Sequence, residues 1–167
     1  VIITVSSTNA FSQVSSNTNS TYASTVTDNN ILQATISLPD ATVAIPRNYS
    51  LERADYVGTG NIGFSSNFAG CYGLKSVNIE STVAISDLTS CFSSCHNLKE
   101  VSTINAANCT SINSTFLSCF NLISPPKFIN LPTSGVSIIN GFQSCLSMKK
   151  PAEFFTNPTN IGTLSQH

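Results

Sequence analysis

The chain has 167 residues, a formal net charge of −1 and only 9% charged residues against 41% apolar ones. This length favours one compact domain, or a small domain with an arm. The low charge argues against a nucleic-acid partner, because phosphate binding needs clustered Lys and Arg. No apolar stretch approaches the ~20 residues needed to cross a bilayer, so we expect no membrane span in this chain.

The first part of the chain, residues 1–60, is predicted to be a β-rich segment. Its strand candidates, rich in β-branched residues, are 1–5, 31–38 and 41–45. Residues 6–30 are mostly Ser, Thr and Asn, and they form either a loop or a polar strand ordered by a neighbouring subunit. We expect residues 1–60 to act as an anchor, a cap or an assembly arm. The expected hinge into the second half of the chain consists of three glycines, Gly58, Gly60 and Gly63.

An internal repeat organises the second half of the chain. Each copy has a large apolar residue, then Phe, then Cys, then Leu or Met. The copies are 64–74, 88–98, 112–122 and 138–148. Their cysteines, Cys71, Cys95, Cys119 and Cys145, follow one another at intervals of 24, 24 and 26 residues. A copy of this size cannot bury its own apolar face, so the pattern predicts that neighbouring copies stack.

The spacing inside a copy predicts its local structure. In the second copy, apolar residues lie at i, i+3, i+7 and i+10, namely Ile85, Leu88, Phe92 and Cys95. This single stripe is typical of a short helix. The alternating run that follows, such as 74–79, is typical of a short strand. In the third and fourth copies, Pro125, Pro126 and Pro151 occupy the strand position and should weaken pairing there.

This pattern resembles the leucine-rich-like repeats of the BspA-like bacterial surface proteins, in the branch with a repeat of about 26 residues. The resemblance covers roughly 61–156. It is carried by the four cysteines and by Phe68, Phe92, Phe116 and Phe142. The first and fourth copies depart from it, with Asn61 and Gly135 in place of the leading apolar residue and Met148 in place of Leu. End copies of a stack often diverge in this way.

The predicted fold class is therefore α+β. A short leucine-rich-repeat-like solenoid of about four helix-turn/strand repeats spans 61–156. The β-rich segment 1–60 precedes it, and a polar C-terminal tail, 157–167, follows it. The resemblance implies a non-catalytic scaffold displayed on cells, in microbial adhesins or on virus particles. It transfers no catalytic residue, because the positions that the family shares are packing positions.

The six cysteines are the main candidates for chemistry. A metal site built on Cys91, Cys95 and His96 lacks the second close pair that structural zinc sites use. We expect free buried thiols, because helix packing would space neighbouring copies about 8–10 Å apart and a disulfide needs Cα atoms within about 7 Å. A thiol nucleophile paired with His96 or His167 would need an electropositive, exposed setting that a core position does not supply. Cys91 and Cys109 are the cysteines for which the redox state stays open.

Other catalytic patterns are also missing from the sequence. The 8 acidic residues are scattered, so no pair is favoured for glycoside hydrolysis. The glycines of 58–63 lack the Lys-Ser/Thr of a phosphate-binding loop. We therefore predict no catalytic residue, no metal ligand and no cofactor, and a protein that is not an enzyme.

One polar position does recur. Lys75, Lys99 and Lys149 each follow the Leu or Met of their copy, and Ile123 interrupts the series. Stacking would place them in a row along one outer edge. This row is either a solvated face that protects strands from edge pairing or a partner-facing strip for an acidic partner.

The sequence thus favours a non-enzymatic extracellular or particle-surface structural protein that uses its repeat slab for protein–protein assembly. The expected partners are copies of itself or a larger surface or virion assembly. The alternative is an adhesion module that binds a host protein or a glycan, as a cell-surface adhesin or a virion fibre or decoration protein. A third hypothesis, a fragment of a carbohydrate-active enzyme, would need a catalytic partner outside the chain. In each case the expected location is extracellular, at a cell surface or a virion surface.

Overall fold

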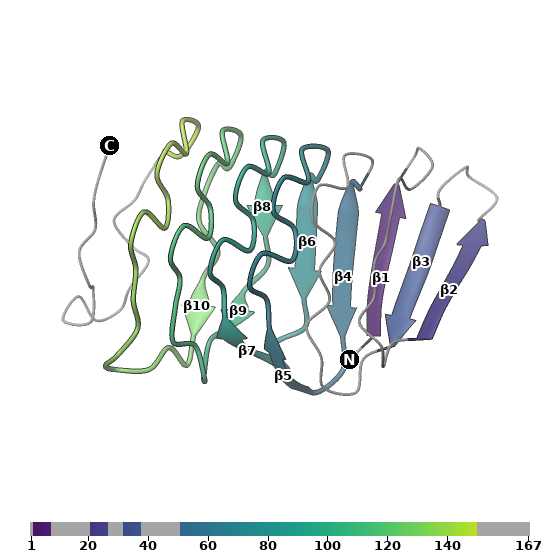
Figure 1. Cartoon of the computed structure of the whole chain (residues 1–167), viewed down its shortest axis with the longest axis horizontal. Coiled ribbons are helices and arrows are strands. Elements are labelled where there is room, and N and C mark those ends of the chain that lie inside the picture. The colour runs from purple at the N-terminus through teal and green to yellow at the C-terminus, as the bar shows by residue number, and fades with distance from the viewer. Residues whose placement is uncertain (1, 8–20, 27–31, 38–50, 150–167) are drawn as a thin grey trace.

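The computed structural model describes residues 2–7, 21–26, 32–37 and 51–149. This part contains ten strands arranged in two sheets (Figure 1). The strands are β1 (Ile2–Ser7), β2 (Thr21–Val26), β3 (Leu32–Ser37), β4 (Arg53–Val57), β5 (Gly60–Gly63), β6 (Ser76–Ile79), β7 (Val83–Asp87), β8 (Glu100–Val101), β9 (Ile104–Asn105) and β10 (Phe128–Ile129). One sheet has the order β2-β3-β1-β4-β6-β8 and the other has the order β10-β9-β7-β5.

The three N-terminal strands extend the first sheet beyond the repeats. β1 pairs antiparallel with both β3 and β4, and β2 pairs antiparallel with β3. β1 and β3 correspond to the strands predicted at 1–5 and 31–38, and β2 lies within the polar stretch whose structure the sequence left open. The segment 41–45, a third strand candidate, lies outside the described residues.

The repeats run parallel in both sheets. β4, β6 and β8 pair parallel in the first sheet, and β5, β7, β9 and β10 pair parallel in the second. We call one passage of the chain through the second sheet, a set of turns and the first sheet a rung. β4 precedes the boundary that the sequence predicted at residue 60, yet it already pairs parallel with β6. Gly60 and Gly63 are the two ends of β5, which pairs with β7, so the expected glycine hinge is part of the repeat instead.

The apolar stripe of each copy lies on turns, where a short helix was expected. The described part of the chain contains no helix. Alternate backbone N–H groups donate to the next rung, as from Phe68 to the carbonyl of Cys91 (2.9 Å). Others close four-residue β-turns, as from Cys71 to the carbonyl of Phe68 (2.9 Å). We call these stacked segments, 64–74, 88–98, 112–122 and 138–148, the turn ribbon.

Left-handed backbone conformations explain why the turn ribbon does not wind into a helix. Positive φ angles recur at two positions of each segment, namely Ser66 and Gly70, Ser90 and Ser94, Ser114 and Ser118, and Asn140 and Ser144. A right-handed helix cannot contain such residues. Because the N–H groups that would bond within a helix bond to the neighbouring rung, each segment depends on its neighbours for its hydrogen bonds.

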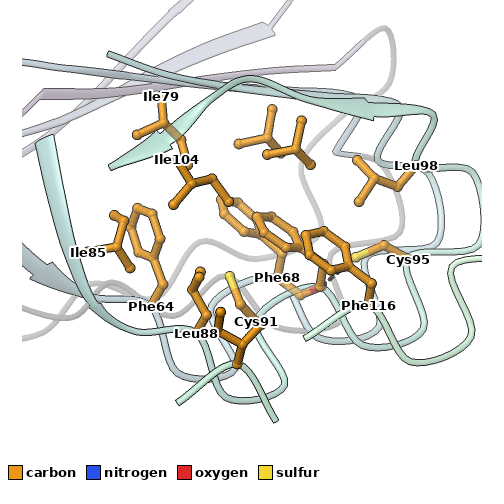
Figure 2. Packing of buried hydrophobic residues seen from close by; sticks show 14 of the residues in the cluster. Phe64, Phe68, Ile79, Ile85, Leu88, Cys91, Cys95, Leu98, Ile104 and Phe116 are labelled. Carbon is orange, nitrogen blue, oxygen red and sulfur yellow. Dashed lines mark hydrogen bonds between the residues drawn. The ribbon is translucent and has the colours of Figure 1, made fainter. Parts of the chain in front are cut away.

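The recurring phenylalanines form a continuous stack through the core. The rings of Phe68 and Phe92 lie 5.5 Å apart with 3° between their planes, and Phe92 and Phe116 lie 5.3 Å apart at 15°. Phe142 extends the stack, 5.1 Å from Phe116. Aliphatic side chains from the two sheets surround the rings, with Ile79 and Ile104 among them (Figure 2). The repeated Phe is therefore at the centre of the core in the first three rungs, and Phe142 packs against that core from the fourth.

Candidate functional site

The recurring cysteines hydrogen-bond between rungs. The Sγ of Cys95 donates to the carbonyl oxygen of Phe68 at 3.1 Å, and Cys119 does the same to Phe92 at 3.1 Å. Cys145 repeats the contact at the carbonyl of Phe116, again at 3.1 Å. All six cysteines are free thiols, five of them buried. These recurring cysteines thus donate hydrogen bonds that join each rung to the one before it, in addition to filling space in the core.

The rungs lie closer together than the packed helices expected from the sequence, which would be about 8–10 Å apart. Backbone hydrogen bonds join the rungs, as from Phe92 to the carbonyl of Thr115 (2.9 Å). Hydrogen-bonded strands lie about 4.8 Å apart, which is within reach of a disulfide. What keeps the thiols of Cys95, Cys119 and Cys145 occupied in the structure is the carbonyl of the preceding rung.

Burial makes these thiols poor nucleophiles. Desolvation raises the pKa of Cys91 and Cys95 well above its ordinary value, and it also raises the pKa of Cys119. At the less enclosed Cys109 and Cys145, desolvation raises the pKa to about 11. The thiolate is the form that attacks carbon or binds a metal. All five groups are therefore overwhelmingly protonated at neutral pH.

His96 belongs to a separate stack on the outside of the turn ribbon. Its ring lies between those of Tyr72 (4.5 Å, 12°) and Phe120 (4.6 Å, 21°). The neighbouring Cys95 directs its Sγ to the Phe68 carbonyl. The described residues contain no group of three His, Cys, Asp or Glu side chains placed to hold a metal ion. His167 lies outside the described residues.

An asparagine ladder runs beside this outer stack. Asn97 donates from Nδ2 to the carbonyl of Tyr72 at 2.8 Å, and Asn121 donates to the carbonyl of His96 at 2.9 Å. The Nδ2 of Asn121 also reaches the Oδ1 of Asn97 at 3.4 Å. The sequence analysis did not recognise that the three stacked rings, or the two ladder asparagines, occupy equivalent positions in successive copies. The signal that was available is their spacing of 24 residues, the same as that of the cysteines.

The structure brings the recurring lysines into one row. The N–H of Lys99 donates to the carbonyl of Lys75 (2.9 Å), Ile123 donates to Lys99 (3.4 Å) and Lys149 donates to Ile123 (3.3 Å). Lys75 forms an ion pair with Glu52 at 2.9 Å. Within the described ranges, no ion pair involves Lys99 or Lys149, and both are exposed. The row therefore presents two uncompensated ammonium groups on either side of the half-exposed Ile123.

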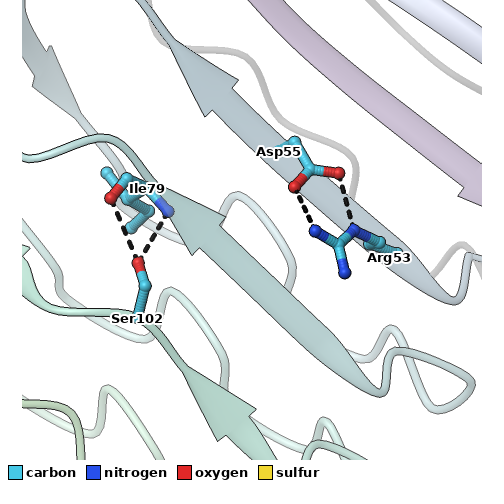
Figure 3. Close-up of polar contacts among 4 residues, drawn as sticks. All are labelled: Arg53, Asp55, Ile79 and Ser102. Atoms are coloured by element: carbon cyan, nitrogen blue, oxygen red, sulfur yellow. Dashed lines mark hydrogen bonds and ion pairs between the residues drawn. The ribbon is translucent and has the colours of Figure 1, made fainter.

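The outer face of the first sheet is polar and slightly hollowed. Arg53 binds Asp55 in a two-pronged ion pair, with both contacts at 2.7 Å (Figure 3). On the side of β6 where β8 has already ended, the hydroxyl of Ser102 accepts from the N–H of Ile79 (2.7 Å) and donates to its carbonyl (3.1 Å). A hollow of about 230 Å³ lies across β4, β6 and β8, with Arg53, Asn78 and Glu100 among its lining residues.

Near the N-terminal end of the parallel stack, in β4 and the first segment of the turn ribbon, two buried polar groups have no hydrogen-bond partner in the described part of the chain. They are the hydroxyl of Tyr56 and the side-chain amide of Asn67. In the third rung the position of Asn67 is taken by Thr115, whose Oγ1 donates to the carbonyl of Leu88 at 2.8 Å. An unpaired buried polar group costs about 1–3 kcal/mol, so among the described residues this end of the stack has the least complete hydrogen bonding.

Comparison with known proteins finds no family model, no curated protein and no solved structure that matches the chain. The described residues also include no helix with the length and hydropathy that a bilayer crossing requires. The class of protein must therefore be argued from the residues and their arrangement.

Proposed function

We propose that this chain is a non-enzymatic structural protein of a cell or virion surface, built as a leucine-rich-like repeat solenoid of the BspA-like kind. In this proposal, the stacked rungs form a rigid slab that packs against other proteins, and residues 1–60 serve as an assembly arm. The expected partners are copies of the chain or a larger surface assembly.

The observation that carries the proposal is that the recurring residues are occupied in joining rungs. Phe92 stacks between Phe68 and Phe116, and the thiol of Cys119 bonds to the carbonyl of Phe92. Catalytic groups need polar atoms that are accessible to a substrate and a pKa matched to the reaction. Here the repeated reactive atoms are buried and protonated, which supports a scaffold.

The lysine row is the surface that we assign to partner contact. Lys99 and Lys149 are exposed and lie on the same edge, with the apolar side chain of Ile123 between them. Two unpaired cations around an apolar side chain suit an acidic protein surface that also carries an apolar residue. Lys75 contributes less, because Glu52 neutralises it.

Two measurements test the proposal. The first is cross-linking with a lysine-reactive reagent on intact source cells or particles, followed by mass spectrometry. We expect the chain in the surface fraction, with cross-links from Lys99 and Lys149 to other polypeptides. Lys127, which is exposed but lies next to β10 in the second sheet, serves as the internal control. Recovery of the chain only as a free intracellular protein would refute the assignment.

The second measurement is thiol alkylation of the native protein near neutral pH. We expect no rapid reaction at Cys95 or Cys119, and full reaction of both once the protein is unfolded in urea. Rapid modification of either thiol in the folded protein would show that the recurring cysteines are open to solvent. The inert-scaffold proposal would then fail, independently of where the protein is located.

The hollow on the first sheet favours a second candidate function, adhesion to a host protein or glycan. Asn78 and Glu100 are exposed there, beside the paired Arg53, and such side chains can hydrogen-bond sugar hydroxyls. A glycan array and a panel of extracellular proteins would test this function. A ligand whose binding is lost in Asn78→Ala but kept in Asn108→Ala, the same change at an exposed site that follows β9 of the second sheet, would favour adhesion over assembly.

A further inference from the structure

The first sheet ends in a strand edge that is open to pairing. β2 is the outermost strand of the six-stranded sheet, and it pairs with β3 over its six residues. On its other side, the described residues provide no strand partner. An edge of this kind presents a row of backbone N–H and C=O groups that can accept another strand.

The residues of β2 lack the usual protection against edge pairing. Its sequence, Thr-Tyr-Ala-Ser-Thr-Val, has no charged residue and no proline. Natural edge strands are commonly kept apart by Lys, by Pro or by being very short. β2 is uncharged, has average length for a strand and is rich in β-branched and aromatic residues, all of which favour pairing.

The opposite end of the same sheet is protected. Its last strand, β8, has only two residues and includes Glu100. In the next rung, the place of the strand is taken by Pro125 and Pro126, and proline cannot donate to a ladder. The two ends of the sheet therefore differ, since one is blocked by short length, charge and proline and the other is not.

From this asymmetry we infer that a second copy of the chain adds to the β2 edge, by antiparallel pairing of β2 with β2 about a two-fold axis. Antiparallel pairing of a strand with itself satisfies both edges with one self-complementary contact, as closed dimers require. Because the β8 end is blocked, the contact closes as a dimer and does not propagate into a filament. The inference rests on the proposed assembly function and identifies its partner.

The register of the sheet supports a two-fold axis perpendicular to it. Through β3 and β1, Tyr22 lies in the same register row as the buried Tyr56 of β4. These register rows place Tyr22, Ser24 and Val26 on one face of the sheet. A pairing centred on Ser24 sets Tyr22 of each copy opposite Val26 of the other, a favourable aromatic and β-branched combination. The same face of both sheets then lies on one side.

Light scattering coupled to size-exclusion chromatography tests the inference on the full chain. We expect the wild type to elute as a dimer. Ala23→Lys adds a positive charge to β2, in the register row of Asp55, and should raise the dimer dissociation constant about tenfold or more through like-charge repulsion. Thr35→Lys is the matched control, because it adds the same charge in the same row on β3, away from the edge, and should remain dimeric.

A mixing experiment separates edge repulsion from misfolding. Ala23→Glu alone should weaken the dimer to a similar extent, whereas an equimolar mixture of Ala23→Lys and Ala23→Glu should recover it, because opposite charges then lie diagonally across the edge, within reach of these side chains. A monomeric wild type would overturn the inference, as would a dimer that Ala23→Lys leaves unchanged or a mixture that stays monomeric. None of these results would affect the cross-links from the lysine row, so a failure here is distinguishable from a failure of the proposed function.

Discussion

Truncation of one ring in the phenylalanine stack should weaken the whole slab. Phe92 is fully buried and stacked on both faces, 5.5 Å from Phe68 and 5.3 Å from Phe116. Removing a buried Phe side chain costs about 3–5 kcal/mol, from lost transfer free energy and the cavity left behind. Both neighbouring rings lose a partner, and each aromatic pair contributes about 0.5–1.5 kcal/mol beyond buried area. For Phe92→Ala we therefore expect a loss of about 4 kcal/mol in the free energy of unfolding.

Urea unfolding followed by far-ultraviolet circular dichroism measures this loss. The matched control is Phe120→Ala, which makes the same chemical change at a partly exposed ring that stacks on His96. We expect the control to lose about 1 kcal/mol, because one stacked contact and little burial are removed. Equal losses in the two variants, or a loss under about 2 kcal/mol for Phe92→Ala, would refute the central role assigned to the stack.

Three further predictions concern the thiols, a rung-joining hydroxyl and the turns. Because burial raises the pKa of Cys109 and Cys145 to about 11, the folded protein retains protons that the unfolded chain releases from about pH 9. The free energy of unfolding should thus have its full value below about pH 9 and fall as the pH rises to about 11. A urea midpoint that does not change over this range would contradict this prediction. Thr115→Val removes the hydroxyl bond to Leu88 and should cost about 1–2 kcal/mol in urea unfolding, and a variant as stable as the wild type would exclude that bond as a contributor. Ser94→Gly relieves a φ of 61° and should raise the thermal midpoint, with a gain of about 0.5–1 kcal/mol, whereas a lower midpoint would mean that the serine hydroxyl matters more than the backbone.

The stacking of repeated copies could be predicted because the residues that cause it recur at a nearly fixed interval in the sequence. Phe and Cys recur with nearly constant spacing, and a residue type that must face its own copy in the next rung has to recur in this way. The structure buries Phe92 and Cys95 in the core together with Leu88. Spacing therefore predicts which residues stack, but it does not predict the backbone that carries them.

The helical turn was predicted wrongly because a turn ribbon and a helix share one apolar spacing. An apolar residue every three or four positions lies on one side of both. The difference lies in non-local hydrogen bonds, such as that from Phe68 to Cys91, which a local pattern does not contain. A usable signal was present, since Ser90 and Ser94 are matched in the next copy by Ser114 and Ser118, all with positive φ.

The candidate surface was predictable to a similar extent. The alignment of Lys75 with Lys99 follows from the repeat and is visible as a backbone hydrogen bond between rungs. The ion pair of Lys75 with Glu52 was not predictable, because Glu52 precedes the first recognisable copy. The stack of Tyr72 on His96 was missed for a different reason, since residues of different types at equivalent positions of the copies are not recognised as a repeat.

The constant interval between the middle rungs has an evolutionary consequence. The backbone N–H groups of segment 88–98 donate to segment 112–122 with the same offset as those of segment 64–74 donate to segment 88–98, and the thiol contacts at Phe68 and Phe92 also recur. A tandem duplication of residues 88–111 would thus insert a cassette whose upper and lower surfaces already fit their new neighbours. Such a gene could lengthen or shorten its product in steps of about 4.8 Å per cassette without redesigning either terminus.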